Sequence, residues 1–256
     1  MNITPYTSNL NEYQYHEYNR FMPKRDQLPL PAEGFSRFND AAHEHDDHQY
    51  RVIGQLLLHC GLRNGTAGHM HEDWIEHGPH GMQVRVPKQW PCNIGQGGQG
   101  CYHCKKETSR GPPDTWKPKS ESGTRVVPIP NDFYDYHLDK RRSIELPQLL
   151  DSYFHLNNGI NTSTSKISEI VHHLARDAGL EKIQGRGMVE RTHCGRTEMF
   201  PDVTPHDLRG SWACQLVRSD VNRFRARDWG GWADVAMLNK YAKFVGGGDG
   251  SDREKY

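Results

Sequence analysis

The sequence predicts a mainly helical α+β fold with a small antiparallel sheet. Apolar residues recur at helical spacing in separate segments, near residues 38–60, 144–155, 163–178, 205–219 and 234–244. Two short stretches, MQVRV at 82–86 and TRVVPI at 124–129, alternate in the manner of half-buried strands. A chain of 256 residues can bury a core. We expect one principal domain over residues 36–245, without an internal repeat.

The N-terminal part divides into an arm and a first helix. Residues 1–35 show no sustained apolar period and include PLPAEG, which predicts an irregular arm. The helical pattern of 38–60 ends at Gly61, a residue typical of helix C-termini. HEHDDH at 43–48 is interpreted as a solvated face of this helix. A short helix is expected after Arg63.

The middle of the chain carries an insertion and a predicted hairpin. Residues 87–118 are rich in Gly, Pro, Cys and Lys and interrupt the two strand segments. The strand at 124–129 is expected to pair with the segment around Lys119 across the turn SESG, which would place that lysine on the lip of a hairpin. GRGMVERTHCGRTEMF, further on, is expected to be loop or short strand. Residues 246–256 are expected to form a flexible tail.

Charge and hydropathy restrict the class of protein. Lys+Arg and Asp+Glu number 32 each, but residues 1–84 carry 6 basic against 11 acidic side chains, whereas residues 85–145 carry 11 against 7. This distribution permits a local anion-binding surface, although a net charge of zero neither supports nor excludes a nucleic-acid partner. No apolar run is long enough to span a bilayer, and the first residues lack the pattern of a signal peptide. We expect a soluble, cytoplasmic protein.

Three of the six cysteines have the spacing of a metal site. CNIGQGGQGCYHC places Cys92, Cys101 and Cys104 with a CxxC at one end, which suits tetrahedral zinc if a fourth ligand exists. His103 and His80 are the nearest candidates for that ligand. Reduced cysteines in a surface loop explain the spacing equally well. A zinc ion here would be structural and would brace the insertion.

TPHDLRG contains a histidine and an arginine at the start of a predicted helix. Thr204 suits the N-cap, Pro205 the first helical position and Asp207 a capping box. His206 and Arg209 are three residues apart and share a helix face, where they could offer a proton and a fixed positive charge to one anion. HxxR pairs also occur on solvated faces, so the pair defines a site only if other residues converge on it.

Four other residues are candidates for the same site. Arg63 can direct its planar guanidinium at a phosphate, or it can simply interact with the negative end of the preceding helix dipole. Lys119 can reach a leaving oxygen, or it can be an ordinary surface lysine. Trp232 follows a Gly-Gly break, and Tyr241 lies nine residues later on a helix face that is also typical of a core residue.

The order and spacing of these residues resemble one family, the tyrosine recombinases or phage-type integrases. That family carries an arginine in a GLR box, a lysine on a β-hairpin before an RxxP stretch, an HxxR box, a His or Trp after Gly, and a nucleophilic tyrosine nine residues beyond it. The matching stretches here are GLR, KSESGTRVVP, HDLR, GW and NKYAK, which contain Arg63, Lys119, His206, Arg209, Trp232 and Tyr241. GLRNGTAGHM and the cysteine-bearing insertion are similar to integrases of archaea and their viruses.

The resemblance implies the tyrosine recombinase catalytic-domain fold and a cleavage reaction that needs no cofactor. Tyr241 would attack a DNA phosphodiester and form a 3′-phosphotyrosyl link. Arg63 and Arg209 would clamp the non-bridging oxygens, while the tryptophan would donate its indole N–H to the phosphate. Lys119 would protonate the leaving 5′ oxygen, and His206 would assist proton transfer at the tyrosine. The loop that starts at Lys119 is one residue longer than in common members, which leaves Lys117 as a rival.

The resemblance also implies partners. A site-specific integrase would join a viral or mobile element to a chromosome, or excise it, as a homotetramer on double-stranded DNA at an attachment site, in the cytoplasm and associated with the nucleoid. Relatives usually carry a separate DNA-gripping domain, whereas only about 35 to 40 residues precede the first predicted helix here. The chain is then a minimal integrase, a catalytic-domain fragment, or a protein that relies on an accessory DNA-binding factor. The alternatives are a type IB topoisomerase-like nicking and closing enzyme and a non-catalytic DNA-binding relative.

Overall fold

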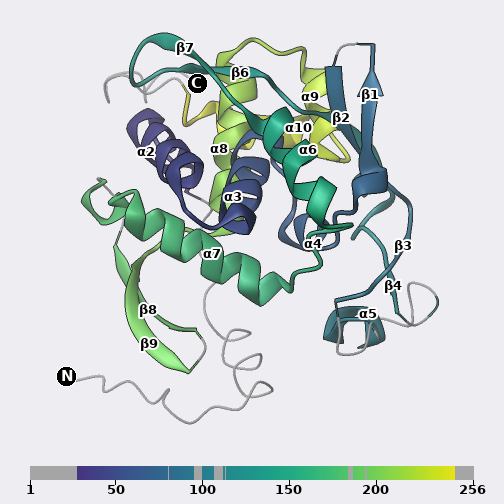
Figure 1. Cartoon of the computed structure of the whole chain (residues 1–256). Coiled ribbons are helices and arrows are strands. Elements are labelled where there is room, and N and C mark those ends of the chain that lie inside the picture. Colours follow the sequence, from purple (N-terminus) through teal and green to yellow (C-terminus); the bar gives the residue numbers. More distant parts are fainter. Residues whose placement is uncertain are drawn as a thin grey trace.

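The computed structural model describes residues 28–79, 81–94, 100–106, 112, 114–183, 187–193 and 195–245. Over these residues, helices enclose a central helix, and antiparallel strands lie at the edges (Figure 1). The fold class predicted from the sequence is therefore confirmed. Most of the predicted N-terminal arm, the predicted C-terminal tail and His80 lie outside the described residues.

The central helix is α3, His48–Cys60. All its residues from Val52 to Cys60 are buried, which explains why apolar residues occupy most of this segment. It packs most extensively against four helices: α2 (Ala32–Glu44), α6 (Leu146–Leu156), α7 (Thr164–Asp177) and α8 (Pro205–Arg218).

The single helix predicted over 38–60 is wrong, because α2 ends at Glu44 and α3 begins at His48. The reason lies in HEHDDH. The Asp47 side chain accepts hydrogen bonds from the backbone N–H groups of Gln49 and Tyr50, at 2.7 and 3.3 Å, and so caps α3. The segment that was interpreted as a solvated helix face is therefore the break between two helices.

The predicted irregular arm also ends earlier than residue 35, because α2 begins at Ala32. The extended residues just before it are fixed to α8. The backbone N–H of Leu28 donates to Asp207 Oδ1 at 2.9 Å, and that of Leu30 donates to Ser211 Oγ at 2.7 Å. Leu30 is buried. This contact covers the first turns of α8.

The main sheet is antiparallel with the order β1 (Ile75–Gly78), β2 (Gly81–Val86), β5 (Arg125–Pro128). Val84 pairs with Val127, and both are buried. The prediction that 124–129 pairs with the segment around Lys119 is wrong, since β2 is the partner. Between Lys119 and β5 the chain forms the 3-10 turn η4 (Glu121–Gly123), which leaves no extended segment for a ladder.

Three smaller antiparallel pairs complete the strands of the described residues. They are β3 (Trp90–Pro91) with β4 (Thr115–Trp116), β6 (Asp132–Asp135) with β7 (Lys140–Ser143), and β8 (Met188–His193) with β9 (Arg196–Pro201). The first pair brings together the two ends of the insertion. The third turns the segment that was expected to be loop or short strand into a hairpin with six-residue strands.

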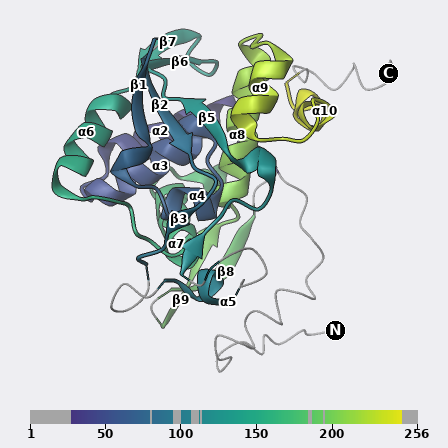
Figure 2. The same ribbon diagram turned by 90° about the vertical axis from the view of Figure 1, so that its right-hand side faces the viewer.

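The remaining elements are short helices: α4 (Asn64–Gly68), η1 (Glu72–Trp74), α5 (Tyr102–Lys106), η5 (Leu180–Lys182), α9 (Arg223–Gly230) and α10 (Ala236–Ala242). The helices predicted near 144–155, 163–178, 205–219 and 234–244 correspond to α6, α7, α8 and α10, whereas α9 and the β6–β7 hairpin were not predicted. Figure 2 shows α8, α9 and α10 together at one edge of the molecule.

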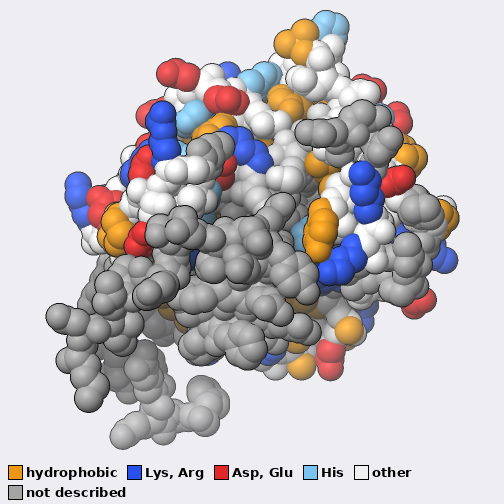
Figure 3. All heavy atoms as spheres, turned by 90° about the horizontal axis from the view of Figure 1, so that it is seen from below, with side chains coloured by type: hydrophobic (Ala, Val, Ile, Leu, Met, Phe, Trp, Pro, Cys, Tyr) orange, Lys and Arg blue, Asp and Glu red, His pale blue; other side chains and the backbone are white. Residues whose placement is uncertain are grey.

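No helix in the described part of the chain is long and apolar enough to cross a membrane. On the face shown in Figure 3, acidic and basic side chains are intermixed among the described residues. Among the described side chains of that face, no large area carries a single sign of charge.

Candidate active site

The start of α8 has the capping geometry that the sequence predicts. The Thr204 hydroxyl accepts a hydrogen bond from the backbone N–H of Asp207 at 3.3 Å, and the Asp207 carboxylate accepts one from the backbone N–H of Thr204 at 2.8 Å. Pro205 occupies the first turn. The capping box fixes the direction in which His206 and Arg209 leave the helix, and both line one open cavity.

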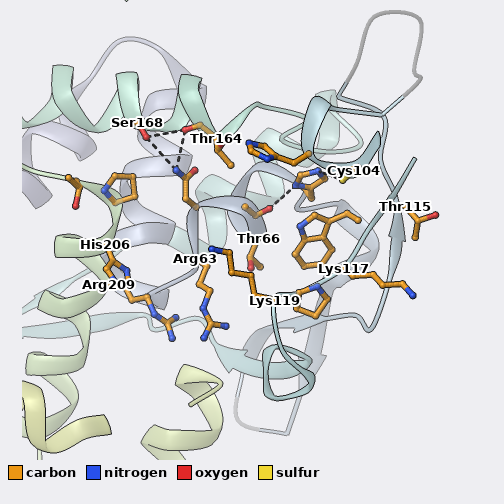
Figure 4. Close-up of a pocket in the computed structure, with 18 residues that line it drawn as sticks. Arg63, Thr66, Cys104, Thr115, Lys117, Lys119, Thr164, Ser168, His206 and Arg209 are labelled. Atoms are coloured by element: carbon orange, nitrogen blue, oxygen red, sulfur yellow. Dashed lines mark hydrogen bonds between the residues drawn. The ribbon is translucent and has the colours of Figure 1, made fainter. Parts of the chain in front are cut away.

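This cavity has a volume of about 890 Å³ and lies between α4, the end of the insertion, α7 and α8. Four of the six predicted site residues line it, although they come from three distant parts of the sequence: Arg63, Lys119, His206 and Arg209 (Figure 4). The guanidinium groups of Arg63 and Arg209 lie side by side in that view. The convergence that the HxxR pair required is therefore present.

Arg209 is the most deeply buried member, with 1% of its surface exposed. Its guanidinium donates to the backbone carbonyls of Gly61 and Gly230 and stacks over the Trp232 ring at 5.1 Å. The side chain thus joins the C-terminal ends of α3 and α9. Burial, followed by the positive charges of the neighbouring arginines, lowers the pKa of Arg209 well below its ordinary value.

Arg63 occupies the N-cap position of α4 and directs its side chain toward the same carbonyl-rich turn. Its Nη2 donates to the Gly231 carbonyl at 3.3 Å. Its Nη1 is buried and has no hydrogen-bond partner among the described residues. A buried donor without a partner is costly, and an oxyanion in the cavity would satisfy it.

Arg125, the arginine of the RxxP stretch, is a third member that the sequence analysis did not select. Its Nε donates to the Trp229 carbonyl and its Nη1 to the Gly123 carbonyl, each at 2.8 Å, while Nη2 is buried without a partner in the described part of the chain. Burial, and then the charge of Arg63, lower the pKa of Arg125 to about 9. Its position in the RxxP stretch was the only available signal.

No carboxylate of the described residues forms an ion pair with Arg63, Arg125 or Arg209. Three guanidinium groups that interact repulsively and are held largely by backbone carbonyls form a strongly positive site. Such a site favours an anion that accepts several hydrogen bonds, and the planar guanidinium suits phosphate oxygens in particular.

The two candidate lysines point in different directions. Lys119 extends toward Arg63, whereas Lys117 extends away from the arginines (Figure 4). Both residues line the cavity. This orientation favours Lys119 over its rival as the lysine that acts at a group held by the arginines.

His206 is exposed as a residue, yet the protein atoms around its ring partly desolvate it. This desolvation, and then the positive charge of Arg209, lower the pKa of His206 below its ordinary value. This shift favours the neutral form of the imidazole. A neutral imidazole can accept a proton, which a charged one cannot.

Trp232 lies next to Arg209, and Tyr241 packs against Trp232, but neither residue lines the cavity. The Trp232 ring packs between Trp212 and Tyr241, with centroid distances of 5.8 and 5.9 Å. Tyr241 is 4% exposed. Burial raises the pKa of its phenol, while the charges of Arg209 and then Arg63 act in the opposite direction. The two charges thus offset part of the effect of burial.

The Gly-Gly break before the tryptophan is needed for this packing. Gly231 ends α9 in the left-handed conformation, with φ of 59°. A Cβ atom on Gly230 would lie 2.2 Å from Trp232 Cε3. Neither position tolerates a side chain without rearrangement.

The predicted cysteine cluster is present, and its fourth member is His69. The ligand atoms of His69, Cys92, Cys101 and Cys104 all lie within 4.8 Å of one another and could hold a structural zinc ion. His103 is exposed and does not belong to the cluster. His69 was not predicted as a ligand because it precedes Cys92, the first cysteine of the cluster, by 23 residues. It lies in the GLRNGTAGHM stretch.

The phage integrase family profile matches residues 127–244. This segment of the chain belongs to the phage integrase family. The matched range contains His206, Arg209, Trp232 and Tyr241. Arg63, Lys119 and the cysteine cluster lie before it. No match is found among curated protein sequences.

Solved structures extend the comparison to most of the chain. The crystal structure of XerA recombinase is similar at a TM-score of 0.51 and 19% identity, over 87% of this chain and 62% of that one. The Tn1549 transposon integrase in complex with transposon right end DNA is similar at a TM-score of 0.52 and 15% identity, over 85% of this chain and 62% of that one. At these identities the likeness establishes the fold, and the chain spans 62% of the length of each protein.

Proposed function

We propose that the chain is a site-specific recombinase that cleaves and rejoins double-stranded DNA, and that it integrates or excises a viral or mobile element. The observation that carries the proposal is the convergence of Arg63, Lys119, His206 and Arg209 on one cavity, with Tyr241 packed against Trp232, the ring on which Arg209 stacks. These are the residue types that DNA cleavage without a metal needs: a nucleophile, positive charge for the phosphoryl oxygens and groups that move protons.

In this mechanism the arginines hold the scissile phosphate. Arg63 Nη1 is buried and unpartnered among the described residues, so a non-bridging oxygen would complete its hydrogen bonding. Arg209 keeps further N–H donors beside the two that contact carbonyls. The charge that builds up on these oxygens in the transition state is stabilised by donors that are already in place.

The phenol oxygen of Tyr241 then attacks phosphorus, and the bond from phosphorus to the 5′ oxygen breaks. The phenol proton passes to the neutral imidazole of His206, while the Lys119 ammonium protonates the departing 5′ oxygen. A 3′-phosphotyrosyl link remains. Attack by a 5′ hydroxyl of the second DNA partner reverses these steps, so the reaction needs neither a cofactor nor ATP.

The partner is DNA with a defined attachment sequence, bound by a homotetramer of this chain, with an accessory DNA-binding factor supplying grip outside the catalytic domain. The DNA complex of the Tn1549 integrase, which has a similar fold, supports DNA as the ligand. We place the reaction in the cytoplasm, at the host nucleoid.

The test is covalent capture on nicked suicide substrates taken from the native element's junction. Wild-type protein is expected to form a protein–DNA adduct that survives a denaturing gel, and Tyr241→Phe is expected to form none. Tyr256→Phe, which changes a tyrosine outside the described residues, serves as the matched control and should behave as wild type. DNA binding without any adduct from the wild type would refute the catalytic proposal.

Sequence dependence distinguishes the recombinase from a type IB topoisomerase-like enzyme. A recombinase should form adducts only on DNA that contains the junction. Relaxation of any supercoiled plasmid at a similar rate would favour the topoisomerase alternative.

A further inference from the structure

The side chains of His69, Cys92, Cys101 and Cys104 converge from two separate parts of the chain. His69 follows α4, whereas the three cysteines belong to the insertion. His69 Nε2 lies 3.2 Å from Cys92 Sγ, 3.7 Å from Cys101 Sγ and 3.5 Å from Cys104 Sγ. Three sulfur atoms therefore surround one ring nitrogen at nearly equal distances.

These separations are those of a tetrahedral zinc site. With Zn–S of about 2.3 Å and Zn–N of about 2.0–2.1 Å, a regular tetrahedron has N···S edges of about 3.6 Å. The three observed distances lie within about 0.4 Å of this value. A histidine with three thiolates is also the soft ligand set that selects zinc over magnesium or calcium.

Neighbouring groups orient the ligands. His69 Nδ1 lies 2.7 Å from the Gly65 carbonyl, which can only accept, so Nδ1 carries the proton and Nε2 presents its lone pair to the sulfur atoms. The backbone N–H of Cys101 donates to Cys92 Sγ at 3.2 Å, a contact that stabilises a thiolate. Trp116 stacks on the His69 ring, with centroids 5.5 Å apart, and shields one side of the cluster.

We propose that this cluster is a structural zinc site that holds two parts of the active site together. Its four ligands are His69, Cys92, Cys101 and Cys104.

The connections to the active site run through both sides of the cluster. On one side, the short helix α4 connects Arg63, which is its N-cap residue, to His69, which is its C-cap residue. On the other, the backbone N–H of Cys92 donates to the Asp114 carbonyl at 2.7 Å, and β3 pairs with β4. The chain continues from β4 directly to Lys119. A bound ion would therefore fix the Arg63 and Lys119 segments relative to each other, a role that rests on the proposed function.

The primary experiment measures metal content by mass spectrometry on the purified full chain, without DNA. About one zinc per chain is expected for wild type. Cys104→Ser and His69→Ala should each lower zinc content or weaken zinc affinity by at least about tenfold. His103→Ala is the matched control, because His103 adjoins Cys104 but lies outside the cluster, and it should retain the wild-type zinc content.

A cobalt titration keeps the proposal testable if a variant fails to fold. Wild-type protein loaded with Co²⁺ should show thiolate-to-metal charge-transfer absorption and the strong visible bands of a tetrahedral site. Absence of zinc from the wild type together with octahedral cobalt spectra would overturn the proposal. Equal zinc loss in His103→Ala and His69→Ala would overturn the assignment of the fourth ligand.

The role in holding the active site has its own readout. Stripping zinc from the wild type with a chelator is expected to slow adduct formation at least about tenfold, and added zinc should restore it. An unchanged adduct rate after complete zinc removal would refute the connection to the active site. If no adduct forms under any condition, the DNA cleavage proposal fails while the metal analysis still decides the zinc site.

Discussion

Replacement of Arg209 by lysine is the most informative single substitution in the active site. The guanidinium spans two backbone carbonyls, of Gly61 and Gly230, and covers the Trp232 ring at 5.1 Å. A lysine keeps the positive charge, but its ammonium is a compact donor that cannot reproduce the planar fork. Arg209→Lys therefore separates the geometry of this residue from its charge.

The expected loss of stability follows from these contacts. One buried carbonyl loses a hydrogen bond to a charged donor, which costs about 1.5–3 kcal/mol. Loss of the stacking on the indole adds about 0.5–1 kcal/mol. The free energy of unfolding should fall by about 2–4 kcal/mol in total. Arg218→Lys is the matched control on the same helix, because Arg218 stacks on Tyr136 at the surface and does not line the cavity.

Urea unfolding followed by tryptophan fluorescence measures this difference, and adduct formation on the suicide substrate measures the second effect. Loss of a donor to the phosphoryl oxygens should slow adduct formation by about 10²–10³-fold at a temperature where the variant is folded. Free energies of unfolding that agree within about 0.5 kcal/mol for Arg209→Lys and wild type would refute the structural reasoning. An adduct rate for Arg209→Lys equal to that of wild type would refute the proposed contact with the phosphate.

The other predictions concern pH and glycine. The lowered pKa of His206 predicts that the adduct rate falls as pH drops below that pKa. His206→Gln should be about 100-fold slower and should not show this decrease at low pH. If the decrease persists in the variant, it belongs to another group. His59 has a folded-state pKa of about 3, so the unfolded chain binds its proton first, and stability should fall by up to about 1.4 kcal/mol per pH unit between pH 6.5 and 3. Urea titrations should give a shallower pH dependence for His59→Gln. Gly231→Ala should cost at least about 2 kcal/mol more than Gly195→Ala in the same assay. Both glycines have positive φ, but only at Gly231 does a Cβ atom approach Ser122 O, at 2.4 Å; equal costs would contradict the clash.

Local signals made part of the fold predictable. The capping box of Thr204 and Asp207 lies within four residues of sequence, and it fixes the start of α8 without help from the rest of the chain. The break at Asp47 uses the same chemistry, but it lies in the polar run HEHDDH, which was interpreted as a solvated face of one continuous helix. The pairing of β5 with β2 could not be predicted from local sequence, because the whole insertion separates the two strands.

The candidate site divides in the same way. Arg63, Lys119, His206 and Arg209 were found through the order of short motifs, and the structure brings them to one cavity. Arg125 and His69 were missed because their roles depend on contacts with distant segments. Arg125 binds the Trp229 carbonyl across 104 residues, and His69 meets Cys104 across 35. The spacing of residues along the chain does not predict such contacts.

The two glycine carbonyls at the end of α9 have a consequence for the rigidity of the site. Arg209 donates to Gly230 and Arg63 to Gly231, and this turn leads directly into the segment that carries Tyr241. Each guanidinium group has more N–H donors than these carbonyls use, and Arg63 Nη1 is one of them. In the proposed reaction a phosphate would therefore bind without breaking the hydrogen bonds to the turn. The segment that carries the tyrosine would then keep the same anchor before and after DNA binds.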